Sequence, residues 1–428
     1  MAGDTTTSFQ SLLKTIWPQK QIYDMLNYGM PFFALLRKDS NLAYKNNIAA
    51  GYGTSQGVST DFASAKANKQ PESNAGFSFQ ASQIYSLASV DRQLIRLSRG
   101  DARAIVGALN RAAQQAILGW KFDCATQLWG NGGGAIGQVG ALSAQYATLL
   151  NVDDVVKFDL NQTLQACPDD GSGQTSAVTA PRPGQVILGK VNRSINQAGA
   201  SVGSTLWHLQ PQSGNWTDPG NIPTLAANDY LFRGGEYNNV LQGVGAWLPA
   251  ADPGGSDSFG GQNRSNDPLR LAGIRIVATG MTPREAAMRI VREALRNSAA
   301  PTHYFENPTN FSDLQLELQS AGLMIVTKEA PASIGSHVFG EPIDGIGFMG
   351  PRGTVKVYAD DRVPSGNVFA LQMDTWYLSG AGEFPSLVAE DGLTIMREEW
   401  ADSFELRVVG DLQLFCTAPG LNARATVS

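Results

Sequence analysis

A long polar segment joins directly to one long helix between Ile48 and Trp129, and this pairing constrains the fold more than any other feature of the chain. The segment from Ile48 to Val90 has short apolar groups, Phe77 and Phe79 among them, beside a polar middle rich in Gly, Ser and Ala. It predicts a two-stranded hairpin. An isolated hairpin is marginally stable in water, so one this long is expected to lie on another surface, such as a neighbouring copy of the chain.

The helix after the hairpin is predicted from Asp101 to about Trp129, where apolar residues recur at steps of three and four. At 1.5 Å per residue it would span roughly 40 Å. Gly130 and Gly132 follow it and can adopt the left-handed conformation that ends a helix. A long helix next to an extended polar hairpin is more typical of a protein that assembles with other copies than of an enzyme.

The rest of the chain alternates between strands and two shorter helices. Short apolar runs separated by Gly, Pro and Asn predict a β-rich region from about 140 to 270, with strands at 155–164, 186–191, 205–209 and 229–232. Thr282, Pro283 and Glu285 combine an N-cap, a first-position proline and a capping-box acid, so a helix is expected from Thr282 to about Asn297. A further helix is predicted over 312–321, and strands over 355–358 and 406–416.

Composition excludes several classes of protein. A chain of 428 residues that is 43% hydrophobic can bury a core or more than one. Its three cysteines, at 124, 167 and 416, are too far apart to predict a disulfide framework or a metal cluster, and they fit a reducing compartment. The N-terminal residues lack a secretion signal, and no run of 18 apolar residues occurs, so we expect a soluble, cytoplasmic protein. A net charge of −6 without a Lys/Arg cluster argues against tight wrapping of nucleic acid.

No residue pattern predicts a catalytic, cofactor or metal site. The three histidines, at 208, 303 and 337, are far apart, and the glycine run 130–137 follows a helix, whereas a phosphate-binding loop follows a strand. Acidic pairs at 153/154, 169/170, 360/361 and 398/399 could supply the two carboxylates of a glycosidase, but each lies near a predicted turn or strand end, where Asp is common. The arginines at 284, 289, 292 and 296 are predicted to line the solvent side of their helix.

Taken in order, these elements resemble the major capsid protein of tailed bacteriophages. The resemblance covers essentially the whole chain. The motifs that carry it are loose and are not invariant catalytic signatures. The segments that carry it are Gly245-Ala-Trp-Leu-Pro249, Phe259, Asn263-Arg-Ser265, Arg270-Leu-Ala-Gly273, Asn307-Pro-Thr-Asn-Phe-Ser-Asp-Leu314, Gly353-Thr-Val-Lys-Val-Tyr358, Asp374-Thr-Trp376, Asp391-Gly392 and Asp402 to Val409.

The resemblance implies an α+β fold of six parts. They are an N-terminal arm (1–47), an extended β-hairpin loop (48–90), a peripheral domain with a spine helix (91–139), a β-rich inserted region (140–270), an axial domain (271–395) and C-terminal strands that return to the peripheral domain (396–428). The inserted region is longer than a minimal coat protein needs. Because no charged helical segment precedes the arm, any scaffold is expected to be a separate chain or to have been removed.

The same resemblance implies a structural protein, without enzyme activity or cofactor, that self-assembles into hexamers and pentamers of an icosahedral head around double-stranded DNA. The partners expected are other copies of itself, together with portal, scaffolding and decoration proteins; contact with packaged DNA would be non-specific, and no membrane is involved. The resemblance implies that the protein is in the host cytoplasm before assembly and in the phage head of the virion afterwards.

Seven residues are predicted to make contacts between subunits. The aromatic ones, which could bury apolar area across subunits, are Trp17, Phe32, Phe33, Phe77 and Phe79. Lys66 and Lys69 lie at the predicted tip of the hairpin, where solubility and a salt contact to a neighbour are the ordinary roles of exposed lysines. A covalent bond from either lysine to a carboxamide of another subunit is the other possibility.

Two further hypotheses remain open. One is a β-rich carbohydrate-active enzyme, which would be a monomer or small oligomer and would lose activity on replacement of one Asp or Glu. The other is a virion accessory protein, such as a shell decoration or tail component. Copy number separates the accessory protein from the shell subunit, because a shell contains hundreds of copies.

Overall fold

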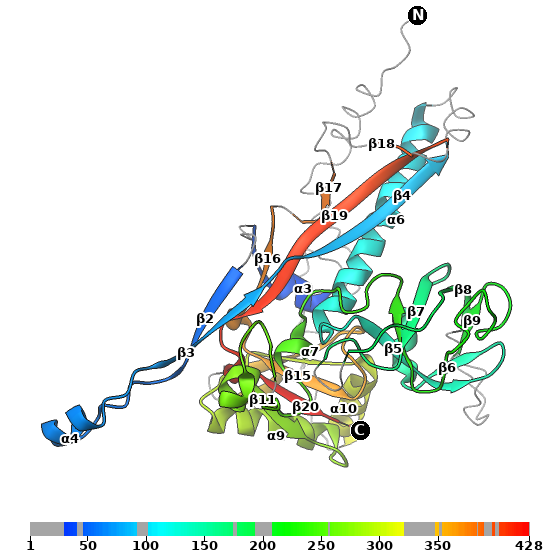
Figure 1. Cartoon of the computed structure of the whole chain (residues 1–428). Coiled ribbons are helices and arrows are strands. Elements are labelled where there is room, and N and C mark those ends of the chain that lie inside the picture. The colour runs from blue at the N-terminus through cyan, green and yellow to red at the C-terminus, as the bar shows by residue number, and fades with distance from the viewer. Residues whose placement is uncertain are drawn as a thin grey trace, which may run out of the picture.

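The longest helix, α6 (Ala102–Trp129), lies along the first of two β-sheets in the computed structural model (Figure 1). The structure describes residues 30–40, 46–91, 102–173, 178–192, 208–255, 257–320, 347–350, 353–382, 384–388, 396–398 and 402–427. The described residues form an α+β fold with two six-stranded sheets, a closed barrel and a two-stranded arm. The predicted end of the long helix at Trp129 is confirmed. Asp101 and the predicted contact residue Trp17 lie outside the described residues.

The first sheet is built on its longest strand, β19 (Ser403–Cys416), which pairs antiparallel with β4 (Ser82–Asp91) over ten residue pairs. α6 packs on this pair, where Trp120 donates a hydrogen bond from Nε1 to the carbonyl of Ile84 at 3.0 Å. A Cβ at Gly410 would lie 2.5 Å from the Trp120 ring, so the glycine lets the indole lie against the strand. The other strands are β1 (Arg37–Asp39), β16 (Trp376–Gly380), β17 (Ser386–Leu387) and β18 (Met396–Arg397).

The predicted hairpin is shorter than the sequence indicated. Its ladder joins β2 (Asn46–Gly53) to β3 (Ser73–Phe79), and the short helix α4 (Phe62–Ala67) lies at its tip. β4 lies in the range predicted for the hairpin but belongs to the first sheet, because ten pairings with β19 and the contact with α6 outweigh its proximity in sequence to β3. Figure 1 shows the arm projecting away from the body of the chain.

A closed six-stranded barrel follows α6. Its strands are β5 (Ala135–Leu142), β6 (Ala147–Leu149), β7 (Thr163–Cys167), β8 (Val186–Val191), β9 (His208–Pro211) and β10 (Tyr230–Arg233). The run 155–164, predicted as a strand, instead begins within the 3₁₀ helix η1 (Val152–Lys157). Val155 and Phe158 are buried three residues apart, which is the spacing of one 3₁₀ turn and not of a strand.

The second sheet has the order β11-β20-β15-β12-β14-β13. Its strands are β11 (Ile274–Val277), β20 (Ala423–Thr426), β15 (Asn367–Leu371), β12 (His303–Glu306), β14 (Gly353–Ala359) and β13 (Gly347–Gly350). The helices α9 (Pro283–Arg296) and α10 (Pro308–Ser320) pack on one face. The predicted capping box of Thr282 and Glu285 is confirmed.

The two sheets share one aromatic cluster. Phe32, on the short helix α3 (Pro31–Leu35), lies 4.5 Å from Trp129, 5.5 Å from Phe305 and 6.4 Å from Trp376, measured between ring centroids. Trp129 also packs on Phe369 and donates a hydrogen bond to the buried Asp360 carboxylate at 3.1 Å. The cluster therefore joins the end of α6, the first sheet and the inner face of the second sheet.

This arrangement predicts that Phe32 stabilises the isolated chain. Phe32→Ala should lower the free energy of unfolding of unassembled protein by about 3–5 kcal/mol, because it removes a fully buried ring and leaves a cavity. Denaturant unfolding of dilute, unassembled protein measures the effect. Leu35→Ala, at a partly exposed position on the same helix, is the matched control and should cost far less. Equal, small effects of both substitutions would contradict the assignment of Phe32 to the core.

Candidate functional site

The tip of the arm is an ordered turn with apolar side chains in water. Asp61 caps α4 by accepting a hydrogen bond from the Ser64 backbone N–H at 2.9 Å, which lowers the pKa of its carboxyl. Gln56 N–H donates to the Gln70 carbonyl at 3.2 Å and closes the turn. Val58 is 88% exposed and Phe62 is 82% exposed.

Exposed apolar groups that gather in one place are typical of interaction surfaces, and Val58 lies four residues before Phe62 in the same turn. Lys66 and Lys69 lie on the same tip and are exposed, as predicted for their position in the hairpin. The tip therefore combines two apolar side chains with two lysines. Sequence reasoning missed Val58 and Phe62, although an isolated aromatic residue in a long polar loop was a signal for them.

The base of the arm is anchored in the body by aromatic packing. Phe77 lies 5.2 Å from Trp247, and Phe79 lies 4.9 Å from Phe259, between ring centroids. Beneath them Arg264 forms a buried ion pair with Asp257 at 2.9 Å, and its guanidinium lies 4.1 Å from the centre of the Phe259 ring. These contacts fix the direction in which the arm leaves the body.

The predicted contacts between subunits need correction at four positions. Phe32, Phe33, Phe77 and Phe79 are all buried within the chain itself, so they have almost no exposed area left to bury against a second copy. Sequence alone identified them as apolar residues of the arm and loop but did not show their partners, which lie as much as 344 positions away in the chain, as between Phe32 and Trp376. Lys66 and Lys69 keep their predicted place at the tip.

A second apolar surface lies on the outer face of the first sheet. Side chains alternate along β4, so that Ile84 and Val90 are buried while Tyr85 and Leu87 are 55% and 58% exposed. β4 belongs to the body of the chain, whereas α4, which begins at Phe62, lies at the free end of the arm (Figure 1). One chain therefore carries two unlike apolar patches at different places.

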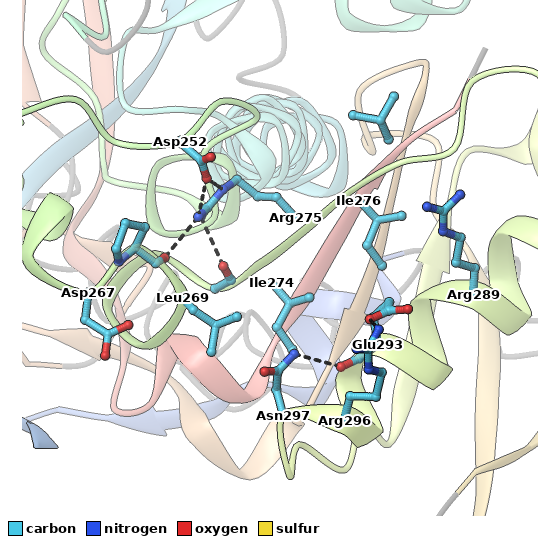
Figure 2. Close-up of a pocket in the computed structure, with 13 residues that line it drawn as sticks. Asp252, Asp267, Leu269, Ile274, Arg275, Ile276, Arg289, Glu293, Arg296 and Asn297 are labelled. Atoms are coloured by element: carbon cyan, nitrogen blue, oxygen red, sulfur yellow. Dashed lines mark hydrogen bonds and ion pairs between the residues drawn. The ribbon is translucent and has the colours of Figure 1, made fainter. Parts of the chain in front are cut away.

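A groove of about 640 Å³ runs beside β11, the strand at one edge of the second sheet (Figure 2). Within the described residues β11 pairs with β20 alone, and Val277 is 71% exposed at its end. Arg275 and Arg296 are paired with Asp252 and Glu293. Arg289 was predicted to face solvent, but its side chain is partly buried beside Ile276, and its Nε has no hydrogen-bond partner in the described part of the chain.

The residues weighed for chemistry have structural surroundings. Asp169 accepts hydrogen bonds from the Thr179 hydroxyl, the Cys167 thiol, the Thr179 backbone N–H and the Tyr237 hydroxyl, and these bonds outweigh burial and hold the pKa of its carboxyl well below its usual range. Burial and the nearby Lys356 lower the pKa of His303 to about 4, so its imidazole is neutral at pH 7. Burial raises the pKa of the Cys416 thiol to about 12.

Among the described residues, no group of three or more His, Cys, Asp or Glu side chains is placed to hold a metal ion. Within the same residues, no helix combines the length and the apolar character needed to cross a bilayer.

Comparison with known proteins finds similarity in structure and not in sequence. No protein-family model matches the chain, and no curated protein does. The capsid of cyanophage A-1(L) is 12% identical, with a TM-score of 0.48 and 93% of each chain covered. A procapsid of satellite phage P4 is 10% identical, with a TM-score of 0.38 over 100% of this chain and 98% of that one. An encapsulin complex from Synechococcus elongatus is 10% identical, with a TM-score of 0.41 over 100% and 91%.

Phage capsid proteins, the class that the sequence resembles, are thus among the solved structures similar to this chain. TM-scores below 0.5 establish no function, so we infer the function from the chain's own geometry.

The tip surface predicts a separation between folding and association. The double substitution Val58→Ser and Phe62→Ser should leave unfolding of the unassembled chain unchanged, because both side chains are exposed, and should weaken self-association at least tenfold. Burial of each side chain at a contact would contribute about 1.5–3 kcal/mol. Light scattering over a concentration series measures the association. Leu316→Ser, which removes an exposed leucine from α10, is the control; an equal loss in the control would show that general solubility, and not the tip, governs association.

Proposed function

We propose that this chain is the structural shell subunit of a tailed-phage head, which assembles into hexamers and pentamers of an icosahedral shell around double-stranded DNA. The observation that carries the proposal is the arm, which projects from the body (Figure 1). Its base is anchored by aromatic packing, and Val58 and Phe62 near its tip are exposed to solvent. A monomeric enzyme does not need a projecting arm with exposed apolar residues. A subunit that binds neighbouring copies needs such a surface.

The two apolar patches support head-to-tail assembly. Contacts that join unlike surfaces of identical chains generate closed rings when the rotation between copies closes. The arm tip and the outer face of β4 are unlike surfaces of this kind, and the groove beside β11 is a third. We propose that the tip of one copy packs on the Tyr85 and Leu87 surface of the next.

The arm has the reach that such a contact needs. Its paired strand β2 has eight residues, which span roughly 27 Å at 3.4 Å per residue. The described segment between the strands, residues 54–72, extends the arm further (Figure 1). Lys66 and Lys69 would then lie against the neighbouring copy, where a salt contact is the expected role.

We assign α6 and the first sheet to the peripheral domain, the second sheet with α9 and α10 to the axial domain, and the barrel to the inserted region. These assignments depart from the ranges that the resemblance implies at two strands, because β16 of the expected axial range 271–395 pairs in the first sheet and β20 of the expected returning segment 396–428 pairs in the second. The chain's net charge of −6 suits a container that holds DNA without adhering to it. Portal, scaffolding and decoration proteins are the further partners proposed, with the phage head as the final location.

The decisive experiment removes the tip and leaves the ladder. Gly53 and Ser73 are paired across the arm, so an Asn-Gly turn can replace residues 54–72 without disturbing either strand. We expect the shortened chain to fold, with a circular dichroism spectrum that loses only the contribution of α4, and to fail to form closed shells. Electron microscopy and light scattering of the wild-type and shortened chains, each produced with and without the neighbouring phage proteins, measure this outcome.

Normal shells from the shortened chain would refute the role of the arm. A wild-type chain that stays monomeric under every condition would refute the shell subunit itself. Particles that contain the chain at tens of copies instead of hundreds would favour an accessory protein of the virion.

A further inference from the structure

One side of the β11 backbone is open to the groove that runs beside it. In a parallel pair of strands, residues whose N–H and C=O point at the neighbour alternate with residues whose groups point away. Ile274 N–H donates to the Asn422 carbonyl, just before β20, at 2.9 Å, so Ile274 and Ile276 face β20. The backbone groups of Arg275 and Val277 therefore point into the groove. Within the described residues no further strand pairs with them.

The groove has a cation without a counter-ion at one end. Arg289 extends from α9 beyond Ile276, near the last residues of β11 (Figure 2). One terminal nitrogen of its guanidinium lies 3.4 Å from the Met281 sulfur, and its Nε is buried without a hydrogen-bond partner. No carboxylate pairs with it in the described part of the chain. A partly buried guanidinium in this state favours a carboxylate supplied by a bound partner.

The opposite end of the groove is acidic. Asp267, which precedes the short helix α8 (Pro268–Ala272), lies on the side of Ile274 in Figure 2. Its carboxylate accepts a hydrogen bond from the Arg270 backbone N–H at 3.0 Å, and the exposed Arg270 guanidinium is 3.7 Å away. The Asp267 side chain is still 27% exposed and can accept further bonds. The other four charged residues that line the groove form two ion pairs with one another.

These two ends make the groove complementary to itself. If two copies place their β11 strands side by side and antiparallel about a twofold axis, the Arg289 end of each groove meets the Asp267 end of the other. A parallel arrangement would set Arg289 against Arg289 and Asp267 against Asp267, which like-charge repulsion disfavours. The charges therefore favour a second copy of the chain in the antiparallel orientation.

The open backbone groups fix the register of such a pair. Arg275 of one copy stands opposite Val277 of the other, and each of these two pairs exchanges both of its N–H···O bonds. Ile276 then faces its own equivalent at the twofold axis. Val277 is 71% exposed in the single chain, and the pairing covers it with the aliphatic part of Arg275 of the second copy, because the two side chains lie on the same face of the sheet.

We propose that two copies of this chain form an antiparallel dimer through β11, in which their second sheets join into one continuous sheet and Arg289 of each copy pairs with Asp267 of the other. The dimer joins like surfaces, whereas the arm contact joins unlike ones, and it leaves the arm free. It does not rest on the shell function. The pairing also closes a sheet edge that would otherwise be a template for unselective strand pairing.

Association through β11 is measured on the full chain with the substitutions Val58→Ser and Phe62→Ser, which remove the apolar side chains of the arm tip. This parent chain should show a reversible monomer–dimer equilibrium in analytical ultracentrifugation over a concentration series, in contrast to the larger assemblies expected of the arm contact. A parent chain that remains monomeric at every concentration would overturn the dimer, whatever the outcome for shells.

Val277→Pro in this parent chain tests the backbone contact. Proline removes the N–H that points into the groove and no bond of the ladder with β20, so the fold should be kept and dimerisation should weaken at least tenfold. Val277→Thr is the matched control, because it keeps the N–H and nearly the same shape, and it should dimerise like the parent. Circular dichroism and denaturant unfolding verify that both variants fold. Equal dimerisation of the two folded variants would contradict the strand pairing.

Arg289→Glu tests the charge complementarity without a change in the strand. It sets a carboxylate against Asp267 of the second copy at both ends of the contact, so dimerisation should weaken at least tenfold. Arg284→Glu makes the same charge change at an exposed position of α9 outside the groove and should leave the dimer unchanged. An equal effect of the two substitutions would show that net charge governs association, and would overturn the pairing of Arg289 with Asp267.

Cysteine crosslinking tests the register. Ile276→Cys would place two thiols in a directly opposed pair without hydrogen bonds, where Cα atoms lie about 4.5 Å apart and a mild oxidant can form a disulfide. Val277→Cys, at a more exposed position, would not face its equivalent and should crosslink far less. The three native cysteines are buried and should not contribute. Crosslinking that is stronger at residue 277, or absent from both variants, would overturn the register.

Discussion

Trp129 is the point on which the rest of the structure depends. It ends α6, packs against Phe32 and Phe369, and donates its indole N–H to the buried carboxylate of Asp360. An indole needs a partner for its N–H when it is buried, and here the partner comes from the loop after β14. One side chain therefore sets the distance and angle between the long helix and the second sheet. The arm and the barrel are positioned relative to this frame, because their bases rest on elements that Trp129 joins.

Alternation along the strands explains how one sheet belongs to two cores. In β12, Tyr304 faces the helices α9 and α10, whereas Phe305 faces the aromatic cluster around Trp129. In β15 the same division separates Val368 from Phe369. Both faces are covered, so β15 has the continuous apolar run Val368 to Leu371 in its sequence. A substitution that shifts a strand of this sheet therefore affects the packing of both hydrophobic cores, because the same backbone separates them.

Sequence reasoning succeeded where the signal was local. The end of α6 at Trp129 and the capping box of Thr282 follow from spacing and cap chemistry within a few residues. It failed where distant segments decide the outcome. The partners of Phe77 and the pairing of β4 with β19 lie more than 150 positions away, and the apolar run beginning at Val155 formed a 3₁₀ turn because both of its large side chains enter the barrel. The exposed tip was also missed, since apolar residues are assigned to a core by default.

The position of β20 has a consequence for the order of synthesis. Residues 423–426 lie between β11 and β15, so the second sheet is joined by a strand that follows all its other strands in the sequence. Within the described residues β11 pairs with β20 alone, so β11 can enter the sheet only after this late segment has been synthesised. A chain truncated before residue 423 consequently lacks a finished second sheet.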